Sequence, residues 1–214
     1  MFRRKVEDLT KDYQVINNIR CLAIDMIDNA NSGHPGMCLS ASTIVWTLFS
    51  RHLNIYPADK NWYNRDRFVL SAGHGVPMLY ACLYMLSYIS LDDCRALRQL
   101  NSITPGHPEI KTPGIDMSTG SLGQGVSVAC GMAAALRKKG SASRVYTILG
   151  DGELQEGQVW EAFQFLAHQK LDNITVYIDN NKRQLDGLLE EVCNPFDLQK
   201  KVEGFGLKCA TVKG

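Results

Sequence analysis

Hydrophobic positions along this chain follow two alternating patterns, which together are typical of an α/β protein. Apolar residues at helical spacing predict helices over residues 6–27, 40–53, 77–88, 92–100 and 197–202. Short runs rich in apolar and β-branched residues predict strands at 67–71, 144–149, 173–179 and 207–212, with a turn at 184–187. Because helices alternate with strands, we expect a doubly wound, mostly parallel sheet.

Two of the predicted strands end in polar residues suited to binding a cation and a phosphate. The runs end at 150–152 (Gly-Asp-Gly) and 179–181 (Asp-Asn-Asn), and a crossover helix would bring both ends to one edge of the sheet. The carboxylate of Asp151 and the amide oxygen of Asn181 are hard ligands for Mg²⁺ or Ca²⁺. Gly152 lets a phosphate approach the backbone closely. The alternative is an ordinary strand–helix–strand unit with turn-forming residues at its ends.

Polar loops supply further candidates for chemistry. His34, His74 and His107 each lie in a loop flanked by glycine or proline. A neutral imidazole can donate to a phosphate or a sugar hydroxyl and can carry a proton near neutral pH. A single loop histidine is more often a solvated surface residue, but three beside a cation-type motif favour function. Glu153 and Glu156 are expected to be solvated acids in a first helical turn.

Bulk properties restrict the classes of function. The 214 residues are expected to form a single domain (1–214) with a sizeable core. A net charge of +1 gives no electrostatic case for a nucleic-acid or membrane partner, and no apolar run is long enough for a membrane span. The N-terminal segment 1–8 lacks the apolar region of a secretion signal. Seven cysteines without a C-x-x-C pair predict buried thiols in a reducing cytoplasm, with zinc unfavoured.

Five loop and strand-end segments carry distinctive motifs: 31–36 (NSGHPG), 64–71 (NRDRFVLS), 104–109 (TPGHPE), 120–125 (GSLGQG) and 150–157 (GDGELQEG). These motifs resemble those of transketolase, in particular the diphosphate-binding N-terminal subunit of the two-chain transketolases. Ser121 supports that subunit type, since single-chain enzymes usually carry proline there. The resemblance implies a thiamin diphosphate-binding fold and transfer of a two-carbon ketol unit between sugar phosphates.

The resemblance also implies how thiamine diphosphate and Mg²⁺ would be bound. The cation would be held by Asp151, by the side chain of Asn181 and by the backbone carbonyl of Arg183. Gly152, Asn181 and His74 would contact the diphosphate. The middle of the cofactor would be lined by Gly120, Ser121 and Leu122.

The remaining implied roles concern the substrate and a partner chain. His34 and His107 would face the hydroxyls of the sugar, and Glu156 would lie at the contact with a pyrimidine-binding C-terminal subunit. Ala72 and Gly75 depart from the residues usual in this family around the Ser-x-Gly-His motif. Two alternatives stay open: a related enzyme such as deoxyxylulose-phosphate synthase, against which segment 34–36 (HPG) argues, and a thiamine-fold protein that binds a partner without catalysis.

Overall fold

The computed structural model describes residues 9–213. Segment 1–8, which includes the predicted start of the first helix and the segment examined for a secretion signal, lies outside the described residues, as does Gly214. The longer helices are α1 (Leu9–Asn29), α4 (Val76–Met85), α6 (Gln124–Lys138) and α7 (Gly157–His168). The strands are β1 (Arg67–Leu70), β2 (Val145–Gly150), β3 (Ile174–Asp179), β4 (Arg183–Gln184) and β5 (Gly187–Leu188). The shorter helices are α2 (Pro35–Ser40), α3 (Ser42–Thr47), α5 (Leu91–Arg95), α8 (Leu189–Cys193) and α9 (Leu198–Gly204), with π-helical and 3₁₀ turns at Leu48–His52, Gly73–Gly75 and Gly152–Gln155.

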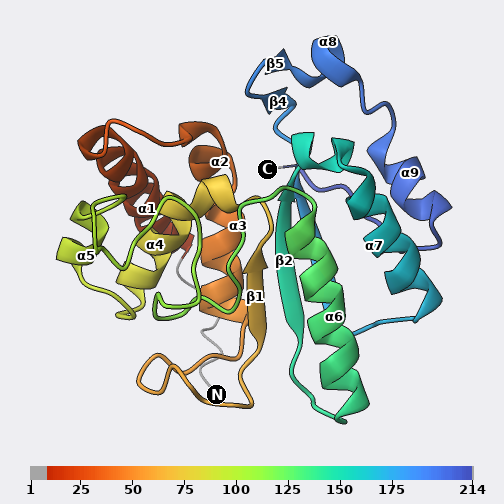
Figure 1. Ribbon diagram of the computed structural model, residues 1–214, viewed down its shortest axis with the longest axis horizontal. Coiled ribbons are helices and arrows are strands. Elements are labelled where there is room, and N and C mark those ends of the chain that lie inside the picture. The colour runs from red at the N-terminus through yellow and green to blue at the C-terminus, as the bar shows by residue number, and fades with distance from the viewer. Residues whose placement is uncertain (1–8, 214) are drawn as a thin grey trace.

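A parallel sheet with the order β1-β2-β3 forms the centre of the described chain (Figure 1). Phe68 lies opposite Tyr146, and Gly150 lies opposite Asp179. The predicted strands and their parallel pairing are therefore confirmed for β1, β2 and β3. Strands β4 and β5 form a separate two-residue antiparallel hairpin, which confirms the predicted turn at 184–187.

Alternating side chains of the sheet serve two hydrophobic cores, one on each face. Helices α1 to α5 pack with Phe68 of β1 and Ile148 of β2 on one face. Helices α6, α7 and α9 pack with Val69 of β1 and Leu149 of β2 on the other face. Strands buried on both faces need continuous apolar runs, which explains the composition of β1 and β2. Helices covering both faces make the sheet doubly wound, as predicted (Figure 1).

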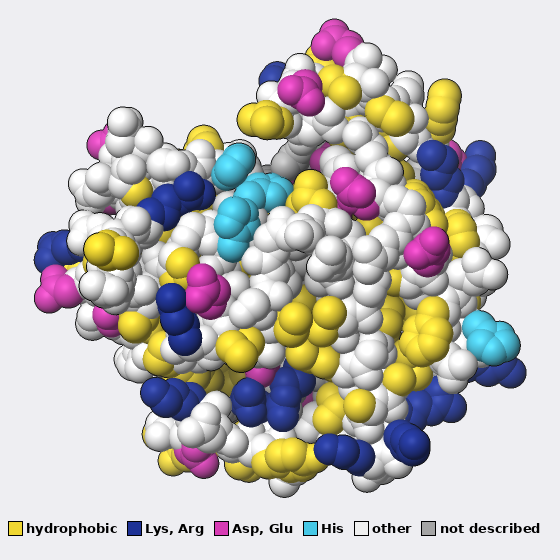
Figure 2. Space-filling view, in the orientation of Figure 1, with side chains coloured by type: hydrophobic (Ala, Val, Ile, Leu, Met, Phe, Trp, Pro, Cys, Tyr) yellow, Lys and Arg dark blue, Asp and Glu magenta, His cyan; other side chains and the backbone are white. Residues whose placement is uncertain are grey.

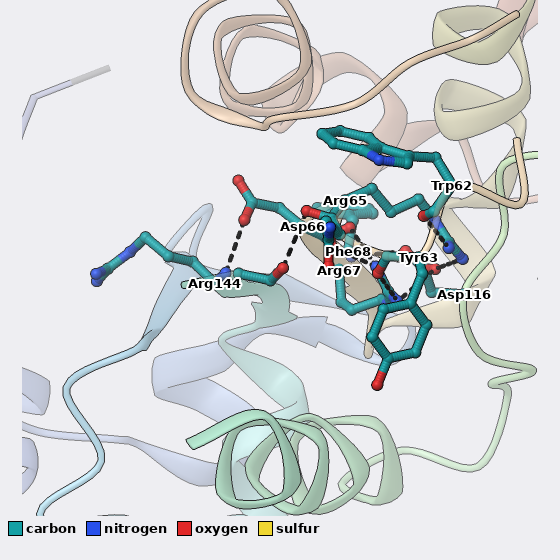
Figure 3. A network of polar contacts seen from close by, with 10 residues as sticks. Trp62, Tyr63, Arg65, Asp66, Arg67, Phe68, Asp116 and Arg144 are labelled. Atoms are coloured by element: carbon teal, nitrogen blue, oxygen red, sulfur yellow. Dashed lines mark hydrogen bonds and ion pairs between the residues drawn. The ribbon is translucent and has the colours of Figure 1, made fainter. Parts of the chain in front are cut away.

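A polar network joins the N-terminal ends of β1 and β2, at the edge opposite the Gly-Asp-Gly motif (Figure 3). One carboxylate oxygen of Asp66 accepts the N–H of Arg144 at 2.7 Å. Asp116 accepts the N–H of Phe68 at 2.9 Å and pairs with the guanidinium of Arg65 at 2.6 Å. These bonds tie the starts of β1 and β2 to each other and to the loop that contains Asp116.

Two predicted elements differ from the structure. The helix predicted over 92–100 ends at Arg95, because Arg98 and Asn101 adopt left-handed backbone conformations with φ of 62° and 63°. The strand predicted over 207–212 is absent, and residues 207–213 have no regular structure. The hydroxyl of Thr211 instead donates to Gln199 at 2.9 Å, so this segment lies along α9. Its β-branched residues lack the neighbouring strand that a sheet requires.

The cysteines only partly follow the prediction of buried thiols. All seven are free; Cys38, Cys82, Cys94 and Cys130 are buried, whereas Cys21 and Cys193 are exposed. Burial raises the pKa of Cys38 to about 11, so this thiol stays protonated near neutral pH. Within residues 9–213, no helix has both the length and the apolar character to cross a membrane.

Candidate cofactor site

Asp151 lies where β2 ends, beside the end of β3. Its N–H donates to the carbonyl of Asp179 at 3.1 Å, so the two strand ends lie side by side as predicted. The side chain is only 1% exposed. One carboxylate oxygen accepts the N–H of Gly152 at 2.9 Å, and the other accepts the N–H of Lys182 at 2.6 Å. This buried carboxylate is therefore held in one orientation by the backbone that follows β3.

Asn181 and Arg183 belong to the same hydrogen-bonded turn. The amide oxygen of Asn181 accepts the N–H of Arg183 at 2.9 Å, and its amide nitrogen donates to Asp179 at 3.1 Å. Asp179 is also buried and accepts the hydroxyl of Ser40 at the end of α2. The structure thus brings together the three residues predicted as cation ligands: Asp151, Asn181 and Arg183.

The electrostatics of this turn favour a bound cation. Burial raises the pKa of Asp151, and the nearby charge of Asp179 raises it further. Burial likewise raises the pKa of Asp179. Among residues 9–213, no ion pair includes either carboxylate. A divalent cation at Asp151 would compensate this buried negative charge and would favour the ionised carboxylates. No cluster of three His, Cys, Asp or Glu side chains suited to a metal occurs in the described part, so a site here depends on amide and carbonyl oxygens as well.

The three loop histidines converge, although they come from distant parts of the chain. His34 is the N-cap of α2, His74 lies in the 3₁₀ turn after β1, and His107 lies in the loop 104–109. The rings of His34 and His74 meet edge to face with centroids 5.2 Å apart. Figure 2 shows histidine side chains gathered on one face of the molecule, near the base of its projecting upper lobe. The three histidines are therefore not isolated from one another, although His34 and His107 are exposed.

Burial and neighbouring positive groups lower the basicity of His74 and His107. Burial, followed by the nearby His34 and His107, lowers the pKa of His74 to about 4. Burial, Arg98 and His34 lower the pKa of His107. At pH 7, His74 and His107 are thus neutral imidazoles that can each donate one hydrogen bond and accept another.

The loop of His107 contacts α4 and lies beside Gly120. The buried hydroxyl of Tyr80 in α4 lies 3.1 Å from the carbonyl of Pro105 and 3.2 Å from that of His107. A Cβ added at Gly120 would lie 3.5 Å from the ring of His107. Ser121 and Leu122, which follow, are exposed. The residues predicted to line the cofactor therefore border the histidine cluster.

Glu153 differs from its prediction as a solvated acid. It is 2% exposed, and one of its oxygens accepts the hydroxyl of Ser71 at 2.5 Å and the N–H of Gly123 at 2.8 Å. The other oxygen lies 3.3 Å from the N–H of Gly150. Glu153 therefore joins the end of β1, the start of α6 and the end of β2. No local sequence pattern predicts this role, because two of its three partners, Ser71 and Gly123, are distant in the chain. Glu156 is exposed as predicted and occupies the N-cap position of α7, without a capping hydrogen bond from its side chain.

A cavity of about 490 Å³ lies between the β4–β5–α8 segment and α9. Asn180, Lys182 and Phe196 are among the residues that line it. None of the three clustered histidines, nor Asp151, borders this cavity. The polar groups suited to catalysis therefore lie outside it, at the carboxyl edge of the sheet.

Comparison with known proteins identifies the family. Residues 11–214 match the family model described as transketolase, thiamine diphosphate binding domain. The chain belongs to this transketolase family. The transketolase of Aquifex aeolicus is 45% identical over 196 residues, which cover 86% of this chain and 28% of that protein. The transketolase of Geobacillus stearothermophilus is 46% identical over 186 residues, which cover 81% of this chain and 28% of that protein.

Solved transketolase structures agree with the family match. The crystal structure of transketolase from Campylobacter jejuni has a TM-score of 0.86 and 40% identity, and the match covers 90% of this chain and 31% of that one. This chain therefore spans about a third of the length of the transketolases it matches. The thiamin diphosphate-binding fold predicted from the sequence is confirmed, and the site lies in the family's cofactor-binding domain.

Proposed function

We propose that this chain is the part of a transketolase that binds the diphosphate and the cation of thiamine diphosphate. Together with a pyrimidine-binding C-terminal partner, it would transfer a two-carbon ketol unit from a ketose phosphate to an aldose phosphate. Thiamine diphosphate, when bound, supplies the carbanion chemistry that such a transfer requires. The observation that carries the proposal is the buried Asp151 carboxylate beside Asn181, at the ends of two parallel strands.

The cation end of the cofactor would be held at this edge of the sheet. Mg²⁺ would be bound by Asp151, by the side chain of Asn181 and by the carbonyl of Arg183, which is the oxygen ligand set that this ion prefers. Gly152 would admit the diphosphate to the backbone, because it carries no side chain. His74 would donate a hydrogen bond to the diphosphate from a neutral ring. The buried carboxylates without an ion-pair partner support this assignment.

The substrate end would lie at the histidine cluster. Gly120, Ser121 and Leu122 would line the middle of the cofactor. His34 and His107 would hydrogen-bond the sugar hydroxyls and move a proton at them, since both residues are exposed and the ring of His107 lies beside Gly120. Glu156 would lie at the contact with the partner, which its exposure at the start of α7 permits.

The test compares Asp151→Ala with the control Asp172→Ala, whose side chain is exposed outside the site. Calorimetry would measure thiamine diphosphate binding to the complex with the partner, with and without Mg²⁺. We expect Asp151→Ala to lose Mg²⁺-dependent binding by at least about 100-fold, because the cation loses its only charged protein ligand. The control should bind normally, and circular dichroism should show both variants folded. Undiminished binding by Asp151→Ala would refute the proposed cation site.

Transfer activity is tested separately with a panel of ketose phosphates and aldose acceptors. The complex should transfer two-carbon units, whereas this chain assayed alone should not. Transfer by this chain without any partner would contradict the proposed division of the active site between two halves.

A further inference from the structure

Arg98 contacts both of the loops that carry the exposed histidines of the cluster. Its guanidinium donates to the hydroxyl of Ser32 at 2.9 Å, two residues before His34. Its backbone N–H donates to the carbonyl of Thr104 at 3.0 Å, three residues before His107. These two loops are more than 60 residues apart in the sequence, and Arg98 connects them.

The guanidinium of Arg98 also lies directly against the backbone of the His107 loop. A Cβ added at Gly106 would lie 2.8 Å from Nε and 2.9 Å from Cζ of Arg98. Only glycine at this position therefore leaves room for the guanidinium in its observed place. Among the described residues, Arg98 forms no ion pair with a carboxylate, so its positive charge stays directed at the histidine cluster.

The backbone of Arg98 is itself held in a demanding conformation. Its φ of 62° lies in the left-handed region, which a residue with a side chain seldom adopts. This conformation ends the turn after α5 and directs the side chain toward Ser32 and Gly106. An arginine fork is more pre-organised than a lysine chain and loses less freedom for each hydrogen bond that it forms.

We infer that Arg98 is a positioning residue, which with Ser32 and Gly106 forms a clasp that holds His34 and His107 at one substrate. The inference rests on the proposed function, in which those two histidines face the sugar. Arg98 acts through the two loops and makes no contact with the substrate itself. A displacement of a reacting group by about 1 Å can cost about 10²-fold in rate, so loosening the clasp should lower turnover.

The first experiment measures kcat, KM and cofactor affinity for clasp variants in the complex with the partner. We expect Arg98→Met, Arg98→Lys and Ser32→Ala each to lower kcat by about 10- to 100-fold with unchanged thiamine diphosphate affinity. The control is Arg95→Met, since Arg95 is exposed and its only ion pair within residues 9–213 is with Asp92. A double variant of Arg98→Met and Ser32→Ala should lose no more than Arg98→Met alone, because the two residues act as one unit. Additive losses, or a wild-type kcat in Arg98→Met, would overturn the clasp.

The same kinetics separate positioning from direct recognition of an anionic group. If Arg98 bound the phosphate of the sugar, Arg98→Met would raise KM for a phosphorylated ketose and leave KM for its unphosphorylated counterpart unchanged. That pattern, with kcat preserved, would contradict the positioning role.

A second measurement does not depend on which reaction the complex performs. The pKa of His107, followed by NMR in this chain, should rise in Arg98→Met, because a neighbouring positive charge is removed. The other groups that face this ring are His34 and His74, while Glu109 in the same loop pairs with Lys111. Gly106→Ala should likewise raise the pKa by displacing the guanidinium. An unchanged pKa in both variants would overturn the clasp even if transketolase activity is found, whereas absent transfer by the wild-type complex would refute only the proposed function.

Discussion

The lowered pKa of His74 allows a quantitative prediction of how the free energy of unfolding depends on pH. In the unfolded chain a histidine titrates near its ordinary pKa of about 6.5. In the folded chain, burial and the neighbouring histidines lower the pKa of His74 to about 4. Between these values the unfolded chain binds more protons than the folded chain, so acid favours unfolding. The contribution of His74 is fully present above about pH 6.5 and is lost as the pH falls toward 4.

The size of the effect follows from the shift. Each pKa unit corresponds to about 1.36 kcal/mol, and the lowering spans about 2.5 units, so the full loss is about 3 kcal/mol. Between pH 7 and pH 5 the same two pKa values predict a loss of about 2 kcal/mol in the free energy of unfolding. The raised pKa values of Asp151 and Asp179 act in the opposite direction, since folding then favours their protonated forms.

The assay is therefore a difference between wild type and His74→Gln, in which the contributions of the carboxylates cancel. Urea unfolding at pH 7 and pH 5 gives the free energy of unfolding for both proteins. We expect His74→Gln to lose about 2 kcal/mol less than wild type over this interval. The control is His168→Gln, because His168 is exposed. If wild type and His74→Gln lose equal stability, the ring is not held neutral by the cluster.

Further predictions concern the site and its supports. His34→Ala and His107→Ala should each lower turnover by about 10²- to 10⁴-fold with cofactor affinity preserved, and a normal rate would place that ring outside the reaction. Gly125→Ala should destabilise the fold by about 1–3 kcal/mol in urea, because its Cβ would lie 2.5 Å from backbone at the end of β1. Gly131→Ala, where nothing lies within 4 Å, is the matched control and should not destabilise it. Glu153→Gln should cost about 1–3 kcal/mol in the same assay by setting an amide donor against a backbone N–H, and equal stability would show that its buried oxygens are not both needed as acceptors.

The parts of the fold set by local pattern could be predicted from the sequence. Short apolar runs predicted β1, β2 and β3; β1 and β2 are buried on both faces and need such runs, whereas β3 is only partly buried. The connection between β2 and β3 then predicted that Asp151 and Asn181 would lie at one edge, since a crossover helix leaves both strand ends on the same side. The strand at 207–212 was predicted on the same pattern and is wrong, because a strand also needs a neighbour, which composition does not reveal.

The parts that depend on distant contacts could not be predicted from the residues themselves. The pattern identified His34, His74 and His107 as chemically suited, but only the packing of α2, β1 and the loop 104–109 brings them together. Glu153 was predicted to be solvated because its position in a first turn is typical of exposed acids. Two of the groups that hold it, the hydroxyl of Ser71 and the N–H of Gly123, lie 82 and 30 residues away, so local sequence patterns do not predict them.

The register of the sheet also has a consequence for the order in which the chain folds. Strand β2 meets β3 through Val145 and Ile174, 29 residues apart, whereas it meets β1 through Val145 and Arg67, 78 residues apart. Closing the longer loop costs about 0.9 kcal/mol more conformational entropy, so the β2–α7–β3 unit is the favoured first contact. That unit contains the Asp151 carboxylate and the Gly152 N–H that donates to it, and Lys182, whose N–H holds the other oxygen, follows three residues after β3. The cation end of the cofactor site thus belongs to an early, local folding unit, while the histidine cluster forms only when β1 docks.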